Sequence, residues 1–119
     1  MLAGMDVTAK LQIKPGQSVA VLKLPPDVAF PVSPTSAEPA AADVVIGFAV
    51  TRQDLDALAA VIEAAKANRL AWIGYPKAGK LGTDLNRDKL VAAVTPEGVQ
   101  PVRQVSIDDT WSALRFRPA

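Results

Sequence analysis

The sequence contains neither cysteine nor histidine. Without cysteine there can be no disulfides, no thiolate nucleophiles and no sulfur-ligated metal sites. Without histidine the chain lacks the usual general base near neutral pH and the commonest metal ligand, which argues strongly against both triad hydrolysis and zinc chemistry. We therefore predict no catalytic residue and no metal site, and any catalysis would have to rest on Asp, Glu, Lys, Tyr or Ser.

Long apolar runs and an excess of one charge are also missing. Lys and Arg number 13 against 12 Asp and Glu, a formal net charge of +1, so a nucleic-acid or membrane-surface role has no electrostatic support. The longest apolar run, 44–50, is about a third of the roughly 20 residues that a membrane-spanning helix needs. The first residues have no basic head followed by an apolar stretch, as a secretion signal would. We expect a cytoplasmic protein.

The length and apolar content indicate one folded unit. The chain has 119 residues, of which 50% are hydrophobic, enough for one core and too few for two. We therefore expect residues 1–119 to form a single α/β domain. Within it, residues 1–9 are a candidate disordered terminus, and the Pro- and Ala-rich stretch 33–42 is expected to be a surface loop.

Short apolar runs bounded by turn formers predict the strands. These runs are 18–23, 43–50, 70–75, 99–107 and 111–117, with a weaker candidate at 28–32 that Pro31 interrupts.

Two helices are expected between the strands. The first, 52–67, begins after the N-cap Thr51 with an acid, Asp54, three positions on, and Asn68 is a plausible left-handed cap at its end. A shorter helix is expected at 86–94.

The order of these elements predicts the topology. A strand, a helix and a strand joined by short links form a βαβ unit with parallel strands. The link Asp108-Asp109-Thr110 joins its two strands as an antiparallel hairpin. The predicted fold is a three-layer α/β domain with a mostly parallel sheet and a C-terminal antiparallel hairpin, a reduced Rossmann-like arrangement.

This order resembles the latter part of the class I methyltransferase fold, in which a final antiparallel strand is inserted beside parallel ones. The resemblance implies that 111–117 lies next to 70–75. Methyltransferases also need a glycine-rich turn after the first strand and an acid after the second. Here those positions are Leu24–Asp27 and Val32–Pro34, which contain no glycine, so we expect neither S-adenosylmethionine binding nor any other cofactor.

A second resemblance rests on three motifs: Lys10-Leu11-Gln12-Ile13-Lys14-Pro15-Gly16-Gln17; Trp72 with Pro76-Lys77-Ala78-Gly79-Lys80 and Gly82; and Trp111-Ser112 with Arg115. With these motifs the sequence resembles a family of short bacterial proteins of unknown function. That family usually has Asp before the last Trp and Gly-Thr after the Ser, where this chain has Thr110, Ala113 and Leu114. The resemblance implies a fold more than a function.

The stretch from Gly74 to Lys80 matches the pattern G-x-x-x-x-G-K of nucleotide-binding P-loops. However, Leu81 stands where such loops need Ser or Thr for magnesium, and Pro76 removes an amide donor from the phosphate cradle.

The same loop contains the candidate binding residues Lys77, Gly79, Lys80 and Gly82. They follow the carboxyl end of a predicted strand, the edge at which open α/β sheets bind ligands. We consider them a candidate anion site, with an ordinary solvated loop as the alternative.

Two other pairs of residues allow a functional and a structural interpretation. Asp108 and Asp109 could act as a carboxylate pair, but Asp is a favoured turn former, and we favour the turn. Trp72 and Trp111 could stack on a ring, but each lies in an apolar strand pattern, and we favour core packing.

The sequence thus favours a non-catalytic or regulatory binding module. One rival is a small enzyme or cofactor-binding protein that uses Lys77, Lys80 and Tyr75. Another is a nucleotide-binding protein that uses the loop ending at Lys80. The sequence does not identify the partner and leaves self-association open.

Overall fold

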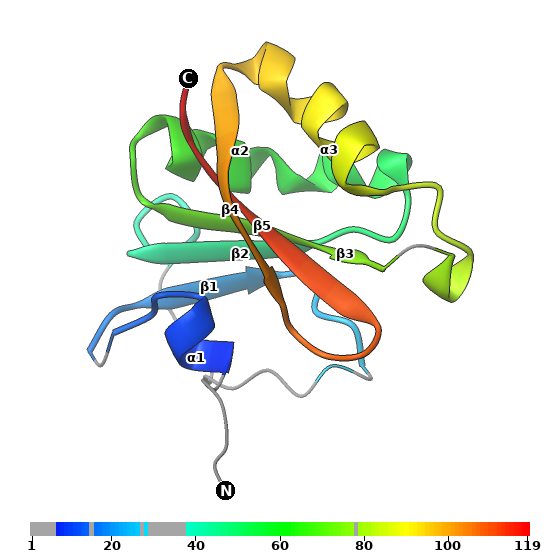
Figure 1. Cartoon of the computed structure of the whole chain (residues 1–119). Helices are drawn as coiled ribbons and strands as arrows, with labels where there is room; N and C mark the ends of the chain where they lie inside the picture. The colour runs from blue at the N-terminus through cyan, green and yellow to red at the C-terminus, as the bar shows by residue number, and fades with distance from the viewer. Residues whose placement is uncertain (1–6, 15, 27, 29–37, 78) are drawn as a thin grey trace, which may run out of the picture.

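The computed structural model describes residues 7–14, 16–26, 28, 38–77 and 79–119, arranged around a mixed five-stranded sheet (Figure 1). The strands are β1 (Val19–Leu22), β2 (Val44–Phe48), β3 (Leu70–Pro76), β4 (Val99–Ser106) and β5 (Trp111–Pro118). They lie in the order β1-β2-β3-β5-β4. The five main strand predictions are therefore confirmed to within three residues at either end.

Parallel and antiparallel pairings are equal in number in this sheet. β1 pairs with β2 and β2 with β3 in parallel, while β5 is antiparallel to both β3 and β4. The prediction of a mostly parallel, three-layer, reduced Rossmann-like or methyltransferase-like domain is wrong, because half of the pairings are antiparallel and the N-terminal segment, not a layer of helices, covers the second face of the sheet. The parallel β2–β3 unit, the hairpin and the placement of β5 beside β3 agree with expectation.

One face of the sheet is covered by helices (Figure 1). They are the 3-10 helix η1 (Arg52–Leu58), which continues into α2 (Ala59–Lys66), and α3 (Arg87–Val94). Thr51 caps η1 through a capping box with Asp54, and Asn68 has the expected left-handed backbone, with φ 61°. Because the first half of the predicted helix 52–67 is a 3-10 helix, the capped start is wound more tightly than expected.

The opposite face is covered by the N-terminal segment instead of by helices of a third layer. α1 (Val7–Lys10) and the residues after it lie below the sheet in Figure 1. Leu11 is fully buried in a core that includes Trp72 and Trp111, and Trp72 Nε1 donates to Leu11 O at 3.0 Å. α1 takes up part of the 1–9 stretch for which disorder was predicted, whereas residues 1–6 lie outside the described residues.

The indoles of Trp72 and Trp111 are buried, with 0% and 1% of their surface exposed. The ring of Trp111 meets that of Phe48 edge to face, with 5.4 Å between centroids. Core packing of both tryptophans is confirmed. Most of the weak strand candidate 28–32 and of the loop 33–42 lies outside the described residues, which include only Val28 and residues 38–42 from them.

Candidate functional site

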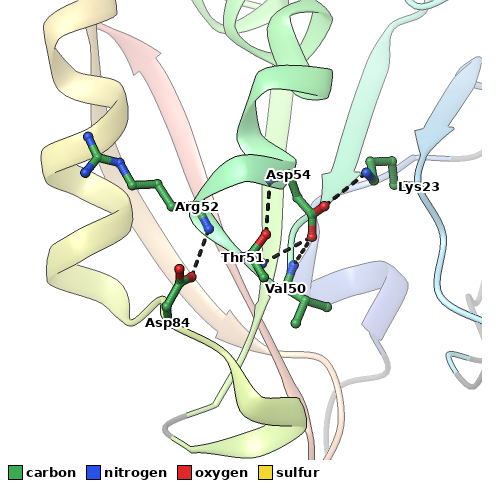
Figure 2. A network of polar contacts seen from close by, with 6 residues as sticks. All are labelled: Lys23, Val50, Thr51, Arg52, Asp54 and Asp84. Atoms are coloured by element: carbon green, nitrogen blue, oxygen red, sulfur yellow. Dashed lines mark hydrogen bonds and ion pairs between the residues drawn. The ribbon is translucent and has the colours of Figure 1, made fainter.

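The carboxylate of Asp54 is the centre of a polar network where β2 leads into η1 (Figure 2). Its Oδ2 accepts the amides of Val50 and Thr51 at 2.9 and 3.1 Å, and its Oδ1 accepts Lys23 Nζ at 3.1 Å. The bond from the Val50 amide holds the pKa of Asp54 below its ordinary value; burial opposes this, and the Thr51 amide and Lys23 reinforce it. The group is therefore a stable anion and a weak general base.

A second carboxylate caps the same helix start. Asp84 Oδ1 accepts the amide of Arg52 at 2.9 Å (Figure 2). Next to it, Thr83 Oγ1 accepts the Leu85 amide at 3.0 Å and donates to the carbonyl of Val50. Because free amides at a helix start favour anions, Asp54 and Asp84 occupy the place that an external anion would take.

The predicted anion site lies in the loop that follows β3. Lys77 Nζ donates to Ser106 Oγ at 2.8 Å, which holds this lysine against the β4–β5 hairpin. Gly79, Lys80 and Gly82 are exposed, and the two glycines have left-handed backbone, with φ 75° and 65°. These observations neither bring the four residues together nor separate them, and the anion site in this loop stays a prediction.

The surroundings of the loop do not favour a P-loop. Lys80 begins the short 3-10 turn η2 (Lys80–Gly82), and α3 starts only at Arg87, so no helix N-terminus follows the lysine. Ala78 lies outside the described residues. Phosphate cradles of P-loops require that helix start.

Asp108 has the turn role expected of it. Its Oδ1 accepts the amides of Thr110 and Trp111 at 2.8 and 2.7 Å, while Asp109 is exposed. The turn interpretation is confirmed for Asp108.

Tyr75 does not contribute a surface hydroxyl to the carboxyl edge. Its side chain is 3% exposed and packs in the core under the helices. Burial raises its pKa, with Arg87 acting in the opposite direction, so the phenol stays protonated at neutral pH. This placement weakens the rival in which Tyr75 acts beside Lys77 and Lys80.

A groove separates η1 and α2 from α3, and the sequence did not predict it. Its larger part has a volume of about 550 Å³. We call its apolar lining residues the floor, which are Leu55, Ala59, Ile62, Ala93 and Val94, and its polar lining residues the rim, which are Arg52, Gln53, Asp56, Glu63 and Glu97. Ile62 and Val94 belong to the main core and Leu55 and Ala93 pack against it, so the floor is continuous with the folded interior.

The groove continues toward the capped helix start. A second part, about 390 Å³, is lined by Arg52, Asp84, Leu85, Lys89, Ala92 and Ala93. Both parts share Arg52 and Ala93, and Figure 2 shows the Arg52 side chain extending from η1 toward α3. The rim of the larger part thus holds three acids beside Arg52, and Lys89 lines the second part.

The sequence indicates some of the residues that line this groove. Asp56 and Glu63 fall off the apolar stripe of the first helix, which marks them as solvent-facing. Nothing local indicates that Glu97, 34 positions after Glu63 along the chain, faces the same groove, because the distance between α2 and α3 depends on packing against the sheet.

A scan against models of known protein families finds no match, and a search of curated proteins finds none either. The resemblance to a short bacterial family and the cytoplasmic location therefore stay predictions, and self-association stays open. Among the described residues, no group of three or more His, Cys, Asp or Glu side chains is placed to hold a metal ion. No helix in that part of the chain has the length and apolarity to cross a membrane.

Proposed function

We propose that this protein is a non-catalytic binding module that holds a short apolar and basic segment of a partner protein in the groove between η1–α2 and α3. The observation that carries the proposal is the combination of an apolar floor with the acidic rim of Asp56, Glu63 and Glu97. Clefts of this size accommodate a few side chains, and grooves between helices commonly receive an amphipathic segment.

Charge complementarity selects the occupant. Of the three rim acids, Glu63 is bonded to Lys66 at 3.4 Å, whereas the ion pairs found among the described residues do not include Asp56 or Glu97. A partner with lysine or arginine beside leucine-like side chains would satisfy both the rim and the floor. Opposite charges at a rim mainly increase the association rate and the specificity.

The state of the other polar groups supports binding over catalysis. The carboxylates of Asp54 and Asp84 are engaged by backbone amides, and the pKa of Asp54 is shifted down, away from neutrality. The phenol of Tyr75 is buried, with its pKa raised. Acid–base catalysis needs groups whose pKa values approach the working pH, and these two move the opposite way.

Fluorescence anisotropy with a labelled amphipathic peptide of Leu and Lys tests the proposal. The variant Asp56→Lys/Glu97→Lys reverses two rim charges, and we expect it to bind at least about tenfold more weakly, as the loss of charge-assisted contacts predicts. A Leu and Glu peptide of the same length should bind the wild type poorly.

The matched control is Asp88→Lys/Asp109→Lys, which changes the net charge equally at exposed acids outside the groove lining. We expect it to change the affinity less than about twofold, since exposed charges that do not line the groove are screened by solvent and salt. Equal weakening by both double variants would show only general electrostatic attraction and would overturn the proposal.

A further inference from the structure

Three arginines lie together on the sheet face opposite the groove. Arg103 of β4 is the register partner of Arg115 of β5, and residues directly opposite in an antiparallel pair point to the same face. Arg117 is two residues after Arg115, so it points to that face as well. The neighbours of this face on β5, Trp111 and Ala113, belong to the core under the N-terminal segment, whereas Leu114 and Phe116 face the helices.

The hydrogen bonds of these arginines go to neutral groups. Arg115 Nη1 donates to Gln12 Oε1 at 2.7 Å, and Arg117 Nε donates to Asn68 Oδ1 at 3.2 Å. Arg115 Nε is buried and has no hydrogen-bond partner among the described residues. No ion pair in the described ranges joins any of the three to an acid.

This arrangement concentrates positive charge at some cost to the fold. Like charges directly opposite each other in a sheet are destabilising. Burial lowers the pKa of Arg115, and the charges of Arg117 and Arg103 lower it further. An anion between the guanidinium groups would remove the repulsion.

The spacing suits one compact anion. Cross-strand partners have Cβ atoms about 5 Å apart, and residues i and i+2 of a strand are about 7 Å apart, within reach of long arginine side chains. Gln12 and Asn68 already orient two of the guanidinium groups, which lowers the ordering cost of binding. A single carboxylate would balance one guanidinium, whereas a phosphoryl dianion balances two and offers three oxygens for bidentate contacts.

We propose that Arg103, Arg115 and Arg117 form a binding site for a phosphoryl dianion, either free phosphate or the phosphate of a monoester. The site is independent of the groove and of the function proposed for it. It differs from the loop around Lys77 and Lys80 because its charges come from paired strands and converge on one face.

NMR titration of the arginine Nε–Hε signals tests the site in a zwitterionic buffer at constant ionic strength. Inorganic phosphate and a short phosphoserine peptide are the two probes, and acetate is the comparison. We expect both phosphoryl probes to shift the signals of the three arginines, with the tighter probe identifying the source of the phosphate. Each of Arg103→Gln and Arg117→Gln should weaken binding about tenfold, the factor expected for one charge-assisted contact.

The exposed Arg103 and Arg117 are the informative positions, because the half-buried Arg115 also contributes to packing. The control Arg52→Gln removes an arginine from the groove and should change phosphate affinity less than about twofold. Shifts scattered over the surface, equal binding of acetate, binding of an oligonucleotide without binding of phosphate, or an equal effect of Arg52→Gln would each overturn the proposal.

Discussion

At the scale of single residues, carboxylates of the chain itself occupy the places where an anion would be expected. Asp54 is recognisable in the sequence, because an acid three positions after a Thr predicts a capping box, and the structure contains that box. The capping role of Asp84 is not recognisable in the sequence, since Asp84 lies 32 positions from Arg52, whose amide donates a hydrogen bond to it. Only the fold brings those two residues together, so the sequence overestimated how open this edge is to ligands.

The role of Asp54 predicts a pH dependence of stability. Its folded-state pKa lies below the ordinary value of 3.8, so its contribution is complete above that value and is lost as the pH falls through the lower folded-state pKa. Asp54→Asn should reduce the free energy of unfolding by about 1.5 to 3 kcal/mol at pH 7, the usual range for hydrogen bonds to a charged group. The deficit should shrink below pH of about 4.

Urea unfolding followed by tryptophan fluorescence at pH 7 and at about pH 3 measures this difference. Asp88→Asn, at an exposed acid of α3, is the control and should stay within about 0.5 kcal/mol of wild type. A deficit for Asp54→Asn that is equal at both pH values would contradict the assignment.

Leu81 has a backbone conformation that suits glycine. Its φ is 54° and its side chain is 53% exposed, so it gains little from burial and incurs about 1 to 2 kcal/mol of steric cost. Leu81→Gly should increase stability by a net amount of about 0.5 to 1 kcal/mol, because the more flexible unfolded chain offsets part of the gain. Leu24→Gly, at an exposed leucine without positive φ, should decrease stability, and a loss in both variants would reject this explanation.

At the scale of elements, local patterns were sufficient for most helices and strands. β3 was expected at 70–75 and spans Leu70–Pro76, and α3 was expected at 86–94 and spans Arg87–Val94. Apolar runs and turn residues act locally, so the elements that they predict are present in the fold. α1 was missed because its four residues are too few for helical periodicity, and it is held by tertiary contacts such as Lys10 Nζ to the carbonyl of Ser106 at 3.3 Å.

The packing of η1 and α2 on β2 depends on Gly47. A Cβ at this position would lie 2.6 Å from Leu58 Cδ2 and 3.0 Å from Val61 Cγ2. Gly47→Ala should therefore cost about 1 to 3 kcal/mol, the usual range for overpacking a core.

A double-mutant cycle with Leu58→Ala separates overpacking from a general effect on the strand. Leu58→Ala alone should cost about 2 to 5 kcal/mol, and the double variant should cost clearly less than the sum, because the truncated side chain leaves room for the new methyl group. Additive losses in urea unfolding would show that Leu58 is not what restricts this position.

At the scale of the whole molecule, the sequence predicted the strands but not the layers. The link 108–110 predicted that β4 and β5 are antiparallel neighbours. The fold class also depends on what covers each face of the sheet, which this link does not indicate. Continuous apolar strands such as β2 indicate that both faces are covered, and helices were assumed on both. The N-terminal segment covers one face instead, with Leu11 under Trp72, an arrangement set by contacts 61 positions apart along the chain.

The distribution of charge over the molecule leads to the last prediction. The net charge is only +1, but the charges are unevenly distributed: three acids lie on the groove rim at one face of the sheet, and the three arginines lie on the other face. If Arg103 and Arg115 repel each other across the strands, Arg103→Gln should raise the free energy of unfolding by about 0.2 to 1 kcal/mol at low ionic strength without phosphate. The gain should disappear near 1 M sodium chloride, where the screening length is about 3 Å, and in phosphate, which would stabilise the wild type more than the more weakly binding variant. Urea unfolding measures both effects. The control Arg52→Gln is expected to show no such gain in stability. A loss of stability in Arg103→Gln at low salt would mean that Arg103 has a favourable partner instead of a repulsive one.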